Sequence, residues 1–556
     1  MKQLVLSVLL SFVLTATFVA CHAADDDVVG QADELSDPVR RQNAISKIQT
    51  IWSQALVAAD GDRSAAGVQE VLDAVVEKMS KVYVENRADT QNGIAMLALM
   101  KEMNDPRAID AFIDALDWRP EVSEAHAERA AQALQRVAVP DGRKAEVVAA
   151  LGTALDKIRQ ARPEDNRMRI EMIRALGAIG DRSATPILTK IATTQSEEQN
   201  FLVNHLAASQ LGSLADPAAV EPLIQGLYLF DPNNPGMRMN DVAASALVSI
   251  GRPSLEPLLG VLRGEDEGAN AMATAYIEAV RQRNAQAAEQ MSVAQVVGSE
   301  ATFALGSLGF REALEPLMAE TNAEDPFRQV NGSLAIVRLN HAEGDRTQIR
   351  TALRRVYTGL PDDAQGVAFK AQMIAAIRSL YDPGFLEFFL AEVQNDENHP
   401  QVRIEAMNAY ALLANKNEMV ALTRWIAGAT EDAYHERFQQ ESEKPVAVAN
   451  ECDEAIPCYI GKLADGDVAV VRKAAFMLGR LGRGNEQVVT ALVDKLNHMD
   501  VQVRLTAVAA LDRVATAGSQ AAIDKISELE EMEAGRRDAV ERCHCGQANL
   551  HVHVVE

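Results

Sequence analysis

The sequence predicts an all-α protein, an α-solenoid of about eleven to twelve helix pairs. First, related stretches recur: "DGDVAVVRKAAFMLGRLG" begins at Asp465 and "MDVQVRLTAVAALDRVA" begins at Met499, with Leu478 and Leu511 in the same place. Second, the 556 residues are 48% hydrophobic but only 4% aromatic, and much of the apolar total is alanine, which favours helices. Third, we find only one short stretch with the alternating pattern of strands, "NLHVHVVE" at the end.

The repeat consists of two apolar residues three positions apart, often followed by Gly, in front of a second helical stretch. In two runs of copies, Leu99 to Leu247 and Leu305 to Leu511, successive anchors lie 31 to 42 residues apart, with one gap of 68. This period is typical of a solenoid of helix hairpins. A single hairpin cannot bury both of its faces, so neighbouring units must stack.

Glycine and proline mark the expected turns of the repeat. Four glycines are expected where the helix reverses, because glycine adopts the left-handed conformation without steric cost: Gly180, Gly251, Gly309 and Gly482. Five prolines are expected in the turn or in the first turn of the next helix, where a missing N–H costs nothing: Pro106, Pro186, Pro217, Pro257 and Pro316.

Asp and Arg residues also recur in the repeat. Asp467 and Asp500 are expected at the start of the second helix of a pair, where a carboxylate caps free N–H groups. Arginines follow about one turn later in several copies: Arg169, Arg328, Arg403, Arg472 and Arg504. In a stack we expect these residues to form a ladder of Asp and Arg between adjacent units, whose main use would be to fix the register.

The chain begins like an exported protein. Lys2 precedes an apolar run from Leu4 to Ala20, so residues 1–23 are expected to be a signal peptide. "FVAC" resembles the lipobox of bacterial lipoproteins, in which Cys21 would be the acylated residue; cleavage by ordinary signal peptidase after Ala23 is the alternative. We therefore expect the protein in the periplasm or at the outer membrane as a lipoprotein, with membrane contact only through the lipid anchor.

The first half of the mature chain is expected to be largely repetitive. Residues 24–36 read as an acidic tether, and residues 37–264 as solenoid. The segment 265–300 breaks the period and is expected to be an irregular helical insertion. "LFDPNNPGMRMND", from Leu229, is expected to be an ordinary long turn.

The second half contains another break. Residues 301–430 and 458–530 read as repeats, whereas residues 431–457 are polar and are expected to form a loop. Cys452 and Cys458 lie six residues apart, and an exported protein favours disulfides, so we predict a local disulfide there.

The tail, residues 531–556, carries an unusual group of sulfur and imidazole side chains. Cys543, Cys545, His551 and His553 are candidate ligands for zinc or copper. Their spacing matches no structural zinc knuckle. A disulfide, free thiols or a tail without a specific role are the alternatives, and we expect no cofactor.

The net charge and the absence of familiar motifs limit the classes of function. A formal net charge of −25 repels the phosphates of nucleic acids, so no nucleic acid partner is expected. The sequence contains no Gly-x-Ser-x-Gly elbow, no His-Glu-x-x-His and no phosphate-binding glycine loop. We therefore expect a protein that is not an enzyme.

The pattern "D-x3-VR" followed by "AA-x-LG-x-LG" resembles HEAT repeats, particularly the short bacterial type also found in phycobilin-lyase-like proteins. The resemblance covers roughly residues 35–530 and is strongest in 160–260 and 458–527. It implies a scaffold that binds a protein partner, as yet unknown, along a concave surface. We expect such a scaffold in the bacterial cell envelope. The alternatives are a metal-binding or catalytic envelope protein that uses the Cys/His tail, and a lyase-like HEAT protein.

Overall fold

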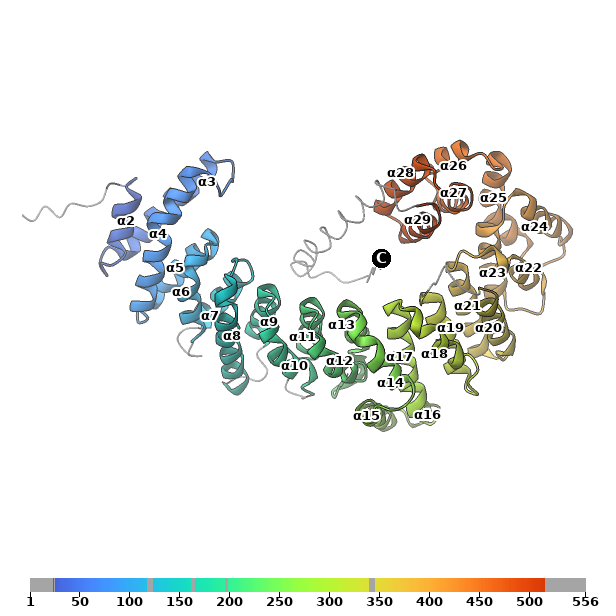
Figure 1. Ribbon diagram of the computed structural model, residues 1–556, viewed down its shortest axis with the longest axis horizontal. Coiled ribbons are helices and arrows are strands. Elements are labelled where there is room, and N and C mark those ends of the chain that lie inside the picture. Colours follow the sequence, from blue (N-terminus) through green and yellow to red (C-terminus); the bar gives the residue numbers. More distant parts are fainter. Residues whose placement is uncertain are drawn as a thin grey trace, which may run out of the picture. The chain divides into compact units, whose positions relative to one another are not determined.

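The computed structural model describes residue 24 and residues 26–117, 124–161, 166–195, 199–339 and 346–515. These residues are mostly helical, and successive helices pack in pairs (Figure 1). The chain divides into two compact units, Met1–Glu300 and Ala301–Glu556, and the boundary falls inside α17 (Val293–Leu308). The predicted all-α solenoid fold is confirmed.

Unit 1 opens with three helices and continues with helix pairs. The opening helices are α2 (Val28–Glu34), α3 (Arg41–Ala58) and α4 (Ala66–Glu85). The paired helices are α5 (Thr90–Met103), α6 (Ile109–Leu116), α7 (Glu124–Leu134), α8 (Asp141–Ala161), α9 (Asn166–Ile179), α10 (Thr185–Thr193), α11 (Phe201–Leu214), α12 (Val220–Gly226), α13 (Asn240–Ile250) and α14 (Leu255–Leu262). After them come α15 (Glu267–Arg283) and α16 (Ala285–Glu289).

The pairs of unit 1 form two layers. Helices α5, α7, α9, α11 and α13 pack directly on one another in this order, and we call them the stacked layer. Figure 1 shows α9, α11 and α13 side by side in this layer, with α10, α12 and α14 on the other side. Each layer buries the apolar stripe of the other, as a helix-pair repeat requires.

One short turn joins the layers again and again. A residue with positive φ ends the first helix at Asn104 (53°), Gly180 (67°) and Ala215 (47°). The next residue is an Asp whose carboxylate accepts a hydrogen bond from the backbone at the start of a 3-10 helix: η1 (Pro106–Ala108), η2 (Arg182–Ala184) and η3 (Pro217–Ala219). At η4 (Arg252–Ser254), Gly251 (77°) stands directly before the 3-10 helix, and no side chain caps it.

The segment from Leu229, expected to be an ordinary turn, contains a β-hairpin. Strands β1 (Phe230–Asp231) and β2 (Asn234–Arg238) pair in antiparallel fashion. The hairpin packs on the helices that break the period: the Phe230 ring lies 5.6 Å from that of Tyr276 in α15, and Arg238 forms an ion pair with Glu300 in α17 (2.8 Å). Thus the two irregular segments of unit 1 form one structure.

Unit 2 repeats the arrangement. Its helices are α18 (Leu314–Glu320), α19 (Pro326–Leu339), α20 (Arg346–Gly359), α21 (Ala364–Ser379), α22 (Leu386–Gln394), α23 (Pro400–Leu413), α24 (Lys416–Gly428), α25 (His435–Cys452), α26 (Ile456–Lys462), α27 (Val468–Leu481), α28 (Glu486–Asp494) and α29 (Val501–Val514). Its 3-10 helices are η5 (Arg311–Ala313), η6 (Pro383–Phe385) and η7 (Lys495–Asn497). Leu478, one anchor of the repeat, is fully buried.

The glycine prediction is wrong at one position. Gly309 has a positive φ of 74°, as expected, but Gly482 has a φ of −98°. The left-handed residue of that turn is Gly484, with a φ of 72°. Gly482 is needed for space instead, because a Cβ there would approach both Val488 and the Leu478 carbonyl.

Residues 24–36 do not form a tether. Residues 28–34 form α2, which packs against α3 and α4. Asp27 caps this helix by accepting a hydrogen bond from the Gly30 N–H (2.9 Å), and Ala32 and Leu35 are buried. The acidic residues that suggested a tether therefore favour the start of a helix, where negative charge is stabilised.

Most of 431–457 is likewise helical, so the expected polar loop is wrong. Helix α25 takes up 435–452, with Pro445 inside it. Its buried residues recur at helical spacing: Phe438, Ser442, Pro445, Val448, Ala449 and Cys452. The polar character of the sequence reflects the exposed face of an amphipathic helix.

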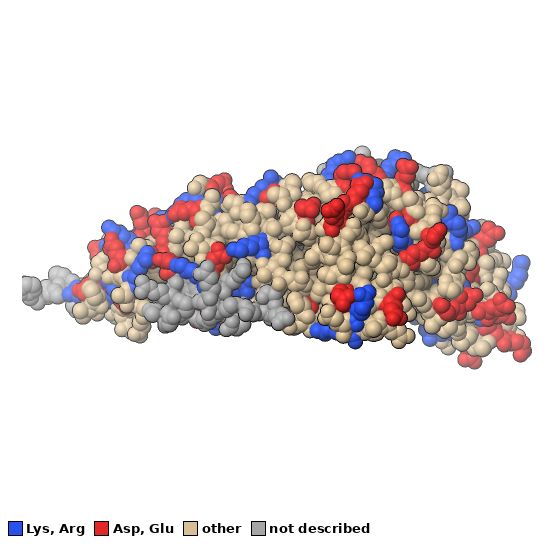
Figure 2. All heavy atoms as spheres, turned by 90° about the horizontal axis from the view of Figure 1, so that it is seen from below, with Lys and Arg blue, Asp and Glu red and all other residues tan. Residues whose placement is uncertain are grey.

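No helix among those described is both long enough and apolar enough to cross a membrane. The surface seen in Figure 2 carries acidic and basic side chains in interspersed groups.

Candidate functional site

Asp467 and Asp500 cap the helices of the last two pairs. The Asp467 carboxylate accepts from the N–H groups of Ala469 (2.9 Å) and Val470 (3.3 Å) at the start of α27. Asp500 does the same for Gln502 (2.8 Å) and Val503 (3.1 Å) in α29. A hydrogen bond from Lys444 is the main cause that lowers the pKa of Asp467, and the backbone hydrogen bonds add to it.

The expected ladder exists at one of the arginines named from the sequence. Arg403 of α23 is almost fully buried. It forms an ion pair with Asp432, which follows the next helix, and donates from Nε to the Val393 carbonyl (2.9 Å). Burial by itself would raise the pKa of Asp432, but hydrogen bonds from Arg403 and the backbone of Tyr434 outweigh it and lower the pKa. A second such pair, Arg41 with Asp89 (2.7 Å), was not anticipated.

At the other arginines the described hydrogen bonds go to other groups. Arg169 donates to Gln199, and Arg472 donates to the Thr506 hydroxyl at 3.5 Å, while the charge of Asp500 also favours the charged form of Arg472. Arg504 turns back to the carbonyls of His498 (2.6 Å) and Met499 (2.9 Å) in the turn before α29. Arg328 pairs with Glu320, at the end of the preceding helix (2.6 Å). Of the arginines named from the sequence, Arg403 is the one with a described ion pair to an Asp.

A buried lysine marks the most unusual polar site in unit 2. Lys473 of α27 has no exposed surface, and its ammonium group donates to the carbonyls of Ala411 (2.9 Å), Leu412 (3.0 Å) and Ala414. These carbonyls lie at the C-terminal end of α23. Carbonyls at this end of a helix lack partners within the helix and carry the negative end of its dipole. A cation from α27 thus satisfies the end of a helix two pairs earlier.

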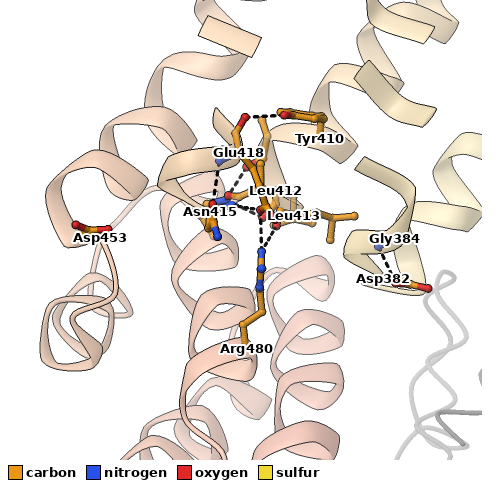
Figure 3. A network of polar contacts seen from close by, with 12 residues as sticks. Asp382, Gly384, Tyr410, Leu412, Leu413, Asn415, Glu418, Asp453 and Arg480 are labelled. Atoms are coloured by element: carbon orange, nitrogen blue, oxygen red, sulfur yellow. Dashed lines mark hydrogen bonds and ion pairs between the residues drawn. The ribbon is translucent and has the colours of Figure 1, made fainter. Parts of the chain in front are cut away.

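Arg480 completes this arrangement two turns further along the same face of α27. It donates to the Leu413 carbonyl (3.1 Å) and to the Glu418 carboxylate (3.0 Å), as Figure 3 shows. Glu418 also accepts from the backbone of Asn415, whose side chain in turn caps α24. We call Lys473, Arg480 and the carbonyls of residues 411–414 the carbonyl cap.

The carbonyl cap positions helices and does not offer a reactive group. Burial, helped by the charge of Arg480 and opposed by Glu418, lowers the pKa of Lys473 to about 7. A lysine with such a pKa would be a nucleophile if a substrate could reach it. Because its ammonium group is enclosed and already hydrogen-bonded to three carbonyls, its role here is to hold α27 against α23.

Close glycine contacts explain the "LG" element of the repeat. A Cβ on Gly212 would lie 2.8 Å from the Ala246 Cα, and one on Gly479 would lie 2.9 Å from the Ala510 Cα. Gly306 stands in the same relation to Ala335 in unit 2. Glycine on one helix and alanine on the next allow the backbones to approach closely, which fixes the register of stacking.

The stacked layer of unit 1 carries polar links from helix to helix. Lys101 of α5 donates to Gln132 of α7 (2.8 Å). Arg167 of α9 forms an ion pair with Glu124 of α7, and Gln135 donates to Glu171 of α9 (2.7 Å). These contacts order half-buried and exposed side chains along α5, α7 and α9, so this edge of the layer is a candidate binding surface.

Cys452 and Cys458 lie close enough to bond. Their Cα atoms are 5.2 Å apart, within the usual range for a disulfide. They connect the last residue of α25 to α26, across a turn of three residues. The disulfide stays a prediction, which chemical titration can test.

Other candidate residues lie outside the described part of the chain. They are Cys21 of the lipobox and the tail residues Cys543, Cys545, His551 and His553. Within the described residues, no three His, Cys, Asp or Glu side chains gather in a way that would hold a metal ion.

Two of the repeats match a family model. The family model described as PBS lyase HEAT-like repeat matches residues 168–193 and 203–228, which correspond to α9 with α10 and to α11 with α12. The chain contains HEAT-like repeats. Their matched region lies within the span in which the sequence resemblance is strongest, and the glycine contact of Gly212 is part of it.

Solved structures with low similarity span most of the HEAT-like chain. A structure of Kap95p bound to RanGDP is 15% identical, with a TM-score of 0.43, over 93% of this chain and 72% of that chain. A structure of importin beta is 12% identical, with a TM-score of 0.42, over 94% and 77%. No curated protein matches the sequence.

Proposed function

We propose that this protein is a non-enzymatic scaffold of the bacterial cell envelope that binds another protein along its HEAT-like repeats. The observation that carries the proposal is the polar edge of the stacked layer. Its side chains are hydrogen-bonded from α5 to α7 and from α7 to α9 before any partner arrives. A preordered surface loses little conformational entropy on binding, so many modest contacts can add up to useful affinity.

The repeats themselves support the proposal. Helix-pair arrays present extended surfaces to which each repeat contributes a few side chains. Ala178 of α9 and Ser213 of α11 are exposed residues of the stacked layer, whereas Glu221 of α12 and Glu256 of α14 are exposed on the other layer. These four positions allow the two layers to be compared.

Site-specific photo-crosslinking in the native envelope tests the proposal. A photoreactive amino acid at Ala178 and at Ser213 should give a crosslink to the same protein, while Glu221 and Glu256 serve as matched control positions. Equal crosslinking from both layers, or only scattered products from Ala178 and Ser213, would show that the stacked layer is not the binding surface.

Localisation in the envelope requires a separate experiment. If Cys21 is acylated, labelled fatty acid should enter the protein and the label should disappear in Cys21→Ala. Export without label would make the protein a soluble periplasmic one. If the signal peptide is not cleaved at all, the proposed location in the cell envelope is wrong.

Metal analysis distinguishes this function from the metalloprotein alternative. Protein purified without a histidine tag should contain no stoichiometric metal. A stoichiometric metal that is lost in Cys543→Ser/Cys545→Ser would favour a metal-binding function for the tail instead.

A further inference from the structure

Guanidinium groups gather around the turn that joins α21 to α22 in unit 2. Arg354 of α20 donates to the Gly384 carbonyl (2.8 Å), and Arg350 forms a longer ion pair with Asp382 (3.4 Å). From the other side, Arg513 of α29 donates to the Tyr381 carbonyl (2.6 Å). Three arginines from two distant helices therefore meet at one short turn.

Local packing fixes the directions of these side chains. Arg350 lies flat on Gly384, where a Cβ would collide with its guanidinium. The Arg354 guanidinium lies over the rings of Phe385 (5.6 Å) and Phe388 (5.8 Å), and its Nε is buried without a hydrogen-bond partner. Figure 3 shows Asp382 and Gly384 in this turn, with the hydrogen bond between them.

Arg346 adds a fourth positive charge to this region. It lies one turn before Arg350 on α20 and two turns before Arg354, so the three share one helix face. It makes no hydrogen bond or ion pair with any residue that the structure describes. Its charge acts on Arg513: burial is the main cause that lowers the pKa of Arg513, and the charge of Arg346 lowers it further.

Among the described residues, two carboxylates, those of Asp382 and Asp512, favour the charged form of Arg513. The Asp382 carboxylate already caps η6 by accepting from the Gly384 N–H (2.9 Å). Among the residues that the structure describes, Asp382 is the carboxylate that forms an ion pair with a member of this group, Arg350, in a chain whose formal net charge is −25. An anion would relieve the repulsion, which is strongest where water is partly excluded.

We propose that this arginine cluster, Arg346, Arg350, Arg354 and Arg513, binds an acidic peptide segment of a partner protein. The proposal rests on the proposed scaffold function and names the chemistry of one contact. Arginine presents a planar fork of donors that matches a carboxylate. A single small anion would satisfy one guanidinium, whereas the cluster offers a row of them.

The spacing of the row favours an extended peptide. Residues 346, 350 and 354 span roughly 12 Å along α20 at about 1.5 Å per residue. Alternate side chains of an extended chain recur about every 6.8 Å, so three of them span roughly 14 Å. Acidic side chains at alternate positions of a peptide thus approach the spacing of the three arginines. A long nucleic acid would also meet the acidic remainder of the surface, which repels it.

A labelled peptide of alternating Glu and Thr tests the proposal by fluorescence anisotropy on the full-length protein. The probe should bind the wild-type protein, and a peptide of the same composition with its Glu residues contiguous should bind less tightly. Binding should weaken as salt increases. Arg346→Gln should weaken binding at least about tenfold, the loss expected from one charge-assisted hydrogen bond.

Two features of the design separate binding from folding. Arg346 has no described hydrogen-bond partner, so Arg346→Gln should leave the melting temperature unchanged. The matched control is Arg263→Gln in unit 1, an exposed arginine in surface ion pairs with Glu256 and Glu265. It should bind the peptide as the wild-type protein does.

Three results would overturn the proposal: no binding of the alternating peptide, equal losses in Arg346→Gln and Arg263→Gln, or tighter binding of inorganic phosphate or a short RNA than of the peptide. Crosslinking from Ala178 and Ser213 tests the scaffold function independently. A captured partner together with absent peptide binding would therefore refute the arginine cluster alone.

Discussion

Gly212 lies against Ala246 so closely that a Cβ on the glycine would come within 2.8 Å of the Ala246 Cα. The two residues belong to α11 and α13, which are neighbours in the stacked layer. The contact between backbones is therefore the point at which one repeat sets the position of the next.

We predict that Gly212→Ala lowers the free energy of unfolding of unit 1 by about 1–3 kcal/mol, because the added methyl overpacks the interface. Urea unfolding measures the change. Gly67→Ala is the matched control: Gly67 lies on an exposed part of α4 with nothing near its missing Cβ. It should be neutral or stabilising, since alanine is the better helix former. A stable Gly212→Ala would mean that the repeats can shift to make room.

Ala215 ends α11 in the left-handed conformation, with a φ of 47°. An L-residue with a Cβ is strained there by about 1–2 kcal/mol. Ala215→Gly should therefore stabilise unit 1, by up to about 1 kcal/mol after the extra entropy of glycine in the unfolded chain is subtracted. Gly180→Ala, at the equivalent turn (67°), should destabilise it. Changes of the same sign in both variants would contradict the strain argument.

Lys473→Met should destabilise unit 2 by roughly 2–3 kcal/mol, because it leaves three buried carbonyls without their charged donor. Lys444→Met is the matched control, since Lys444 is exposed and pairs with Asp467 at the surface. We expect it to cost no more than about 1 kcal/mol. Thermal and urea unfolding compare the two variants, and equal losses would mean that the carbonyl cap contributes no more than a surface ion pair.

The same lysine should make stability depend on pH. Its pKa of about 7 in the folded protein lies below that of an unfolded lysine, near 10.4. Between these values the unfolded chain binds more protons, so the contribution of Lys473 to stability rises as the pH rises from about 7 to about 10. The wild-type protein should therefore gain stability over this window relative to Lys473→Met. Parallel curves would show that Lys473 titrates normally.

His126 should give unit 1 a loss of stability in acid. The imidazole is buried in α7, with its Nδ1 2.8 Å from the Tyr83 hydroxyl and its Nε2 3.0 Å from the Thr90 carbonyl. Burial lowers the pKa of His126, and the charge of Arg129 lowers it further. The hydrogen bond to the Thr90 carbonyl acts in the opposite direction. The unfolded chain is then protonated first, so stability falls as the pH drops below about 6.5.

Hydrogen exchange of peptides from α5 and α7 measures this loss. Protection in the wild-type protein should decrease between neutral and mildly acidic pH, after correction for the intrinsic exchange rate. His126→Gln should show a shallower dependence. An unchanged slope in the variant would assign the acid sensitivity to other groups.

The cysteine pair can be tested chemically. Unfolded, unreduced protein should show two fewer titratable thiols than reduced protein if Cys452 and Cys458 are the only pair. Replacing both with alanine should cost about 2 kcal/mol, as expected for a short closed loop, and should loosen the turn between α25 and α26. Finding every cysteine free would exclude the disulfide.

The repeat could be predicted because it is written in residues that satisfy local rules. Leu478 is buried at the anchor position, and Asp467 and Asp500 cap helices that begin where they lie. Helix α25 escaped prediction because its apolar residues are sparse among polar ones and Pro445 interrupts them. The β-hairpin did so because its short strands depend on packing against Tyr276 and Glu300, far along the chain.

The sequence contains a weak indication of the carbonyl cap, which can be interpreted only with the structure. Three other copies of the repeat place an apolar residue directly after the arginine, Ile170, Ile404 and Leu505, whereas Arg328 is followed by Gln329. Lys473 takes that place in its own copy and is buried there, so it must find acceptors. Which acceptors it finds depends on tertiary packing, since the carbonyls lie about 60 residues earlier.

The contacts of Lys473 and Arg513 alter how the C-terminal end of unit 2 comes apart. In a simple array, each helix pair meets only its neighbours, and fraying can advance one pair at a time. Arg513 instead donates to carbonyls 132 and 133 residues earlier in the chain. Because these hydrogen bonds skip over intervening helix pairs, we expect helices α26 to α29 to unfold together as one cooperative block.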